Sequence, residues 1–281
     1  MDTKTIFKID EIEKEFSIDN TPEFKYGDDQ VLSNQNTDIS YGQPWYENGY
    51  SELDFLSVEE FESLENGLID SIRNIIKKEI PSLDLTDFTL ENYHNFVKTD
   101  EEHFKVVTKT RDLFSEDFNF TIEKYLPKLE NLLNYNLTDI DPINNRKLHI
   151  IVRINRPLSK DYNPPHKDIY EGMDNEGYIP PIINFWIPIA GATDKNNLPL
   201  APKSHTINEN SVLRTFEGGI IEGNKYRVRM IKSWNGDNSL IRSKVKFGQV
   251  LVFSSHLIHG LATNEEKDKT RVALEFRLFK K

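Results

Sequence analysis

The spacing of apolar residues changes near residue 148, and this change most limits what the chain can fold into. Before it, apolar side chains recur every three or four residues, the period of an amphipathic helix. After it, short runs rich in β-branched and aromatic residues are separated by Pro, Gly and Asn, as in strands. No helical period lies between these runs, which disfavours a sheet built from β-α-β units. The sequence therefore predicts helices first and an antiparallel β core second.

The helical pattern is best defined just before Pro81. Ser57 is followed three residues later by Glu60, the spacing of a capping box that satisfies free N–H groups at a helix start. Apolar residues then recur at helical spacing until Pro81, which cannot continue a helix. We expect a helix over 57–80.

Two further segments show weaker helical patterning. They cover about 87–112 and about 116–134, the second including Phe118 and Ile122. Pro127 is expected to kink this second helix. Residues 1–50 are polar and rich in turn-forming residues, and their pattern assigns no element.

The strand-like runs of the second part are short and evenly distributed. A single α+β domain over 1–281 follows, with a mainly helical part (1–145) packed around a barrel or sandwich (146–281). The predicted strands are 148–155, 182–189, 225–231, 250–253 and 271–279.

Composition excludes several classes of protein. The chain has 281 residues, no Cys and a formal net charge of −11. Without thiolates, any metal site needs nitrogen and oxygen ligands. The acidic balance argues against nucleic acid or an anionic membrane as partner. With neither a signal-like apolar run at the N-terminus nor a membrane-length one, we expect a cytoplasmic protein.

A short His-Lys-Asp sequence offers metal ligands. In an extended segment residues two apart share a face, so His166 and Asp168 can present a nitrogen and an oxygen to one ion. His259, after the apolar strand at 250–253, is a candidate third ligand, with His256 as its rival. Two His and one carboxylate leave positions open, as in non-heme Fe(II) oxygenases. The alternative is a turn in which Asp168 caps the backbone and His166 is exposed.

Arg271 opens the last predicted strand, where a guanidinium can bind a carboxylate through two parallel hydrogen bonds. With this residue in place, the second part as a whole resembles the phytanoyl-CoA dioxygenase-like family of Fe(II)/2-oxoglutarate-dependent oxygenases. The matching stretches, in order, are 166–168, 183–189, 198–205, 247–253, 257–260 and 270–274. Lys203 departs from the family pattern, which has Gly there.

The resemblance implies a double-stranded β-helix (jelly-roll, cupin-like) core. It implies Fe(II) held by His166, Asp168 and His259, with 2-oxoglutarate as co-substrate, held by Arg271, and O2 as oxidant. Because Asp168 retains the carboxylate that halogenating relatives lack, the reaction it implies is hydroxylation, with 2-oxoglutarate converted to succinate and CO2.

Three further residues are candidates for contacts with co-substrate or substrate. Arg153 and Asn155 resemble an Arg-x-Asn pair found in some hydroxylases of the family; the alternative is a strand with one polar face. Asn184 is a candidate for the other end of 2-oxoglutarate.

A cationic stretch suggests the nature of the substrate. Residues 1–145 carry 13 basic and 32 acidic side chains, whereas 146–281 carry 22 basic and 14 acidic. Residues 225–246 hold seven Lys and Arg against Asp237 alone, and Arg227 and Arg229 would share one face of the strand predicted there. This favours a small anionic substrate, with Trp234 in a lid. The alternative is an exposed edge that deters aggregation.

Two other functions remain open. One is a cupin-like metal-dependent isomerase or hydrolase, and the other a non-catalytic ligand-binding barrel. Neither requires a guanidinium at Arg271 for a dicarboxylate. No pattern in the sequence sets an oligomeric state.

Overall fold

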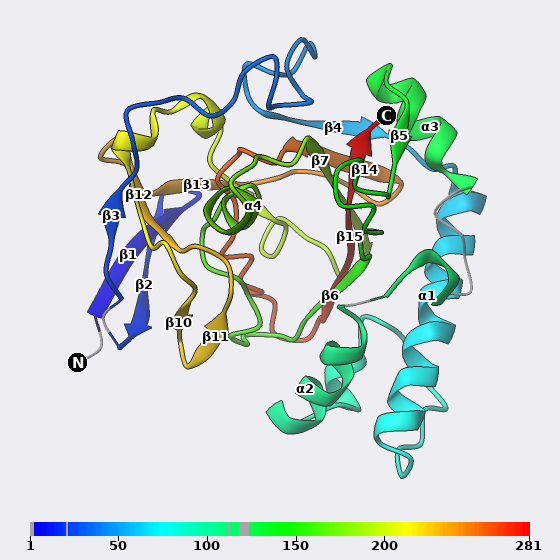
Figure 1. Cartoon of the computed structure of the whole chain (residues 1–281). Coiled ribbons are helices and arrows are strands. Elements are labelled where there is room, and N and C mark those ends of the chain that lie inside the picture. Colours follow the sequence, from blue (N-terminus) through cyan, green and yellow to red (C-terminus); the bar gives the residue numbers. More distant parts are fainter. Residues whose placement is uncertain (1–2, 21, 112, 118–123) are drawn as a thin grey trace.

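The computed structural model describes residues 3–20, 22–111, 113–117 and 124–281 (Figure 1). In the described part, the helices are α1 (Val58–Glu79), α2 (Asp100–Lys109), α3 (Leu126–Leu133) and α4 (Tyr170–Glu176). The strands before α4 are β1 (Thr3–Ile9), β2 (Ile12–Asp19), β3 (Lys25–Tyr26), β4 (Tyr50–Asp54), β5 (Leu137–Thr138) and β6 (Ile151–Asn155). Those after it are β7 (Ile182–Ala190), β8 (Pro199–Leu200), β9 (Val212–Arg214), β10 (Gly219–Ile221), β11 (Asn224–Tyr226), β12 (Ile231–Trp234), β13 (Ser239–Arg242), β14 (Gln249–Ser254) and β15 (Arg271–Lys280).

The larger sheet has the order β4-β14-β7-β15, and β15 also pairs with both β5 and β6. All of its pairings are antiparallel, and the longest runs along β7 and β15. One face of this sheet packs on α1, α2 and α3, which lie together to one side of it in Figure 1. Leu64, Leu68, Ile72 and Ile76 of α1 supply much of that contact, because they recur on one helical face.

The opposing layer combines strands from both ends of the sequence. One of its sheets has the order β11-β10-β2-β1-β13-β8, with β1 parallel to β13, and the other has the order β12-β9-β3. Leu198 and Leu200 from this side meet Trp186, Leu251 and Phe253 of the larger sheet in one apolar cluster. The two layers thus enclose an interior, and the core is the predicted jelly roll.

Side chains of β15 alternate between the two faces of the larger sheet. Val272, Leu274, Phe276 and Leu278 pack in the helical cluster. Arg271, Ala273, Glu275 and Arg277 consequently face the interior of the jelly roll. This single strand places three charged side chains inside the core.

The first helix forms as predicted. Ser57 and Glu60 make the reciprocal capping box, and the helix ends before Pro81 with Ile80 as its last cap. The later helices are shorter than predicted: the described part of 87–112 contains α2 and the 3-10 turn Tyr93–Asn95, and α3 is the α-helix in the described part of 116–134.

Pro127 lies in the first turn of α3 rather than kinking a longer helix, because the missing N–H of proline costs nothing there. Phe118 and Ile122 lie outside the described residues. In the described part of 1–145, the α-helices lie between Val58 and Leu133. The preceding segment contributes β1 to β4, since β1 and β2 form a hairpin whose edges pair with β13 and β10.

Four of the five predicted strands form, as β6, β7, β14 and β15. The predicted strand 225–231 is wrong: β11 ends at Tyr226 and β12 begins at Ile231. Hydrogen bonds to side chains hold residues 227–230 outside any sheet. Arg229 binds Asn175 of α4, and the N–H of Met230 donates to Thr215 Oγ1.

No helix in the described ranges is both long enough and apolar enough to cross a membrane.

Candidate metal and co-substrate site

His166, Asp168 and His259 meet in the interior, and one candidate ligand atom from each lies within 4.8 Å of the others. The two His residues are backbone partners: the N–H of His166 donates to His259 O at 2.9 Å, and the reverse bond measures 3.1 Å. The N–H of Asp168 donates to Ser255 O at 3.1 Å, which fixes the third ligand. The local backbone therefore brings together three residues from two distant segments.

Hydrogen bonds to the two rings leave the inward nitrogens free for a metal. His166 Nδ1 lies 2.8 Å from Pro164 O, and His259 Nδ1 lies 3.0 Å from Leu257 O. Since a carbonyl only accepts, each Nδ1 carries the proton and each Nε2 presents its lone pair. The Nε2 atoms lie 3.5 and 3.8 Å from the Asp168 carboxylate.

The electrostatics of the three residues also suit a cation. Burial, and secondarily His166, lowers the pKa of His259 to about 4, so its ring is neutral near pH 7. Burial alone would raise the pKa of Asp168, but Arg277 and the two His residues hold it well below its usual value. Asp168 Oδ2 is buried with no hydrogen-bond partner among the described residues. Two imidazole nitrogens and an ionised carboxylate are a donor set that fits Fe(II).

The structure places His259, and not His256, beside His166 and Asp168. His256 is buried away from this centre, with Nε2 3.0 Å from Thr37 O. Gly260, after His259, has φ of +142°, and a Cβ there would lie 2.5 Å from Pro164 O. Only glycine allows this close approach.

Arg271 is buried in one cavity with two of the candidate metal ligands, and no acidic side chain among the described residues is bonded to it. Its Nη2 donates to Asn155 Oδ1, and Asn155 is its cross-strand neighbour on β6. Its Nε and Nη1 are buried and have no hydrogen-bond partner in the described part of the chain. Burial, and next Arg153, lowers the pKa of Arg271 to about 9. A buried guanidinium with free donors is costly unless an anion joins it, so the site fits a carboxylate ligand.

The other end of β15 holds residues that the sequence reasoning missed. Glu275 accepts two hydrogen bonds from Arg153, at 2.9 and 3.0 Å. Arg277 donates to Asp168 Oδ1 at 2.9 Å and to Glu275 at 3.2 Å. Arg153 and Arg277 overcome the effect of burial and lower the pKa of Glu275 to about 2. Counting in steps of two from Arg271 along the strand would have found both residues.

The predicted co-substrate residues lie on the interior face. Asn155 is engaged at both ends, because its Nδ2 donates to Asp161 O and Ala262 O while its Oδ1 accepts from Arg271. Asn184 on β7 is 1% exposed, and neither amide atom has a hydrogen-bond partner among the described residues. Asn155 is thus placed to orient Arg271, and Asn184 retains free polar groups.

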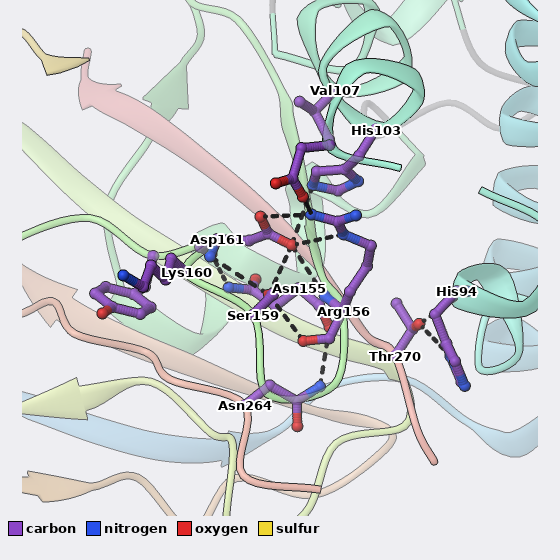
Figure 2. A network of polar contacts seen from close by, with 12 residues as sticks. His94, His103, Val107, Asn155, Arg156, Ser159, Lys160, Asp161, Asn264 and Thr270 are labelled. Carbon is purple, nitrogen blue, oxygen red and sulfur yellow. Dashed lines mark hydrogen bonds and ion pairs between the residues drawn. The ribbon is translucent and has the colours of Figure 1, made fainter. Parts of the chain in front are cut away.

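Figure 2 shows the polar contacts that surround Asn155. Asp161, whose carbonyl accepts from Asn155, binds Arg156 Nε at 3.1 Å and Ser159 Oγ at 2.7 Å. His103 of α2 lies 3.3 Å from the Asp161 carboxylate. A polar network therefore links helix α2 to the surroundings of Arg271.

Two cavities meet at the triad, and both are lined by Arg153 and His166. The first also contains Asn155, His259 and Arg271. The second, of about 330 Å³, lies against Asp168 and is also lined by Arg146, Arg229 and Arg277. Its volume is at the lower end of the range for small-molecule sites.

The predicted substrate residues separate in space. Arg229 is buried and lines the second cavity, where its Nη2 donates to Asn175 Oδ1 at 2.7 Å. Arg227 is exposed on the link after β11 and lines an outer cleft. The two do not share a strand face, since no strand forms there.

Trp234 is 3% exposed and belongs to a buried apolar cluster that includes Phe7 and Leu240, so it does not form part of a lid. It begins the tight turn to β13, in which Asn235 and Gly236 have positive φ and Trp234 N donates to Asp237 O at 2.9 Å. This is the backbone of a two-residue hairpin loop.

Lys203, where the resembled family has Gly, keeps the glycine-like backbone with φ of +67°. Its side chain pairs with Glu47 at 2.7 Å. The turn is therefore retained despite the substitution.

No protein-family model matches the chain, and no curated protein matches its sequence. Among solved structures, the chain is similar to EctD from S. alaskensis with 2-oxoglutarate and 5-hydroxyectoine. The two have a TM-score of 0.47 and 12% sequence identity, and the match covers 93% of this chain and 84% of that one. AviO1 from Streptomyces viridochromogenes Tue57 gives a TM-score of 0.45 with 12% identity over 89% and 96% of the two chains. ThoJ, described as a non-heme monooxygenase, gives a TM-score of 0.47 with 14% identity, and the match covers 84% of this chain and 75% of that one. At these scores, the fold assignment rests on the strand order and register given above.

Proposed function

We propose that this chain is a non-heme Fe(II)/2-oxoglutarate-dependent oxygenase that hydroxylates a small polar, anionic metabolite. The observation that carries the proposal is the buried Arg271, with unpaired donors, in one cavity with two members of a His-Asp-His triad. With Fe(II) bound, the chemistry supplied is hydroxylation of substrate by O2 as 2-oxoglutarate becomes succinate and CO2.

The residues of the chain divide the remaining tasks. Arg271 binds the distal carboxylate of 2-oxoglutarate, and Asn155 orients the guanidinium. Asn184 offers its free amide to the other end of the co-substrate. Surrounding apolar residues, including Trp186 at 5.5 Å from the Arg271 guanidinium, exclude water and strengthen the charge pairing.

The substrate is assigned to the second cavity. His166 and Asp168 line this cavity, and Arg229 and Arg277 in its wall favour an anionic group. Its size supports a small molecule as substrate. As part of the same proposal, the protein acts in the cytoplasm, with neither nucleic acid nor membrane as partner.

Purified protein with Fe(II), 2-oxoglutarate and O2 should form succinate, and Asp168→Ala protein should not. A screen of carboxylated and phosphorylated metabolites for stimulated succinate formation would identify the substrate. Succinate formation by neither protein would reject the proposal. The isomerase, hydrolase and binding-barrel alternatives leave the unpaired donors of Arg271 unexplained.

A further inference from the structure

The His-Lys-Asp turn has two faces, and the second face carries a buried ion pair. Because side chains alternate in an extended segment, Lys167 points away from the side on which His166 and Asp168 meet. Its Nζ lies 2.6 Å from Glu209 Oε1, and the two side chains are 0% and 2% exposed. A fully buried charge pair thus lies directly behind the candidate metal ligands.

Glu209 is itself held firmly. Its Oε2 accepts from the hydroxyl of Tyr170 at 2.7 Å. Its backbone N–H donates to Gln30 O at 2.8 Å, and its carbonyl accepts from Gly27 N at 3.0 Å. The acceptor for Lys167 is therefore anchored to a segment remote from the turn.

A buried ion pair is poor evidence for stability, since removing two charges from water costs about as much as their attraction returns. What such a pair does supply is a fixed geometry. Lys167 lies between His166 and Asp168 in the chain, so fixing its side chain restrains the backbone that carries both candidate ligands. Groups that orient metal ligands affect metal affinity by about 10- to 100-fold.

We propose that Lys167 and Glu209 are positioning residues that set the spacing of His166 and Asp168 for the metal. This inference rests on the proposed metal site and adds a role that no ligand of the site performs. The pair touches neither metal nor co-substrate, so its effect should appear first in metal affinity.

The test compares Co(II) binding by calorimetric titration in wild-type protein and in the double variant Lys167→Met/Glu209→Gln. The double variant removes one positive and one negative charge, so direct electrostatic effects on a bound cation largely cancel. The Gln side chain still accepts from Tyr170. We expect the Co(II) dissociation constant to rise by about 10-fold or more. The exposed pair Lys203→Met/Glu47→Gln serves as the matched control and should leave it unchanged.

The single variant Lys167→Met separates position from charge. Loss of a nearby positive charge would by itself tighten cation binding, whereas loss of positioning weakens it. Tyr170→Phe keeps both charges and frees Glu209, so a smaller weakening is expected even if the double variant fails to fold. Unchanged Co(II) affinity in a folded double variant, or in Tyr170→Phe, would overturn the inference. Failure of wild-type protein to bind Co(II) would instead reject the proposed metal site.

Discussion

The two arginines near the ends of the interior face of β15 have opposite surroundings. Arg277 is paired with the carboxylates of Asp168 and Glu275, whereas Arg271 is buried beside an amide and keeps two donors unpaired. The same side chain on the same face therefore does two jobs. At one end it completes an internal network, and at the other its free donors are the ones that we propose bind an external carboxylate.

Removing the carboxylate at the paired end should have the largest effect. Asp168→Ala deletes a proposed metal ligand and leaves Arg277 without its main partner. We expect Co(II) affinity to fall by more than about 100-fold and Fe(II)-dependent succinate formation to vanish. Calorimetry and a succinate assay check both, and near-wild-type Co(II) binding would show that the triad is not the metal site.

Removing the unpaired arginine should weaken the co-substrate instead of the metal. Arg271→Ala should raise the 2-oxoglutarate dissociation constant by about 100-fold, the loss of a charge-assisted bidentate contact. Co(II) affinity should stay within about twofold, since Arg271 contacts no ligand of the triad in the structure. Equal 2-oxoglutarate binding in both proteins would contradict the contrast between the two ends.

Arg277→Gln should weaken binding of the metal and not of 2-oxoglutarate, the reverse of Arg271→Ala, and the change in affinity should be smaller. Asp168 loses a charged donor, so Co(II) affinity is expected to fall about 10-fold. The dissociation constant for 2-oxoglutarate, measured at saturating metal, should be unchanged. A larger effect on 2-oxoglutarate than on the metal would reverse the assignment of the two arginines.

The network behind Asn155 should make stability depend on pH. Burial, only partly offset by Asp161, lowers the pKa of His103 to about 4, below its unfolded value of about 6.5. The unfolded chain therefore binds more protons between these values, and stability should fall as pH decreases from 6.5 to 4. Urea unfolding of His103→Gln should show a flatter dependence, while an equal slope in both proteins would assign the effect elsewhere.

Arg227→Gln should have the smallest effect. The side chain is exposed and lines only the outer cleft and a neighbouring surface cavity, so KM for the substrate found by the metabolite screen should change by less than about twofold. A large increase in KM would move the substrate site toward that cleft.

Sequence reasoning succeeded where a pattern was local. Strands β6, β7, β14 and β15 are long and apolar enough to be recognised from their residues. His166 and Asp168 lie two residues apart in one extended segment, which places them on the same face. The β1–β2 hairpin was not predicted, because its charged residues interrupt the alternation of apolar and polar side chains. Its partners β10 and β13 are also more than 200 residues away in the sequence.

The misplaced residues have long-range causes. Arg229 left the predicted strand because Asp174 and Asn175 of α4 bind it. Glu209 gave no signal, because its partner Lys167 lies 42 residues earlier. Such pairings form only when the jelly roll brings distant segments together, so no short stretch of sequence predicts them.

The most direct test of the central claim is anaerobic titration of the protein with Fe(II) and then 2-oxoglutarate, followed by visible absorption. Chelation of 2-oxoglutarate by iron at the triad predicts a charge-transfer band that saturates at one equivalent, and Arg271→Ala protein should need about 100-fold more 2-oxoglutarate to reach it. Absence of the band from wild-type protein at saturating concentrations would contradict the account.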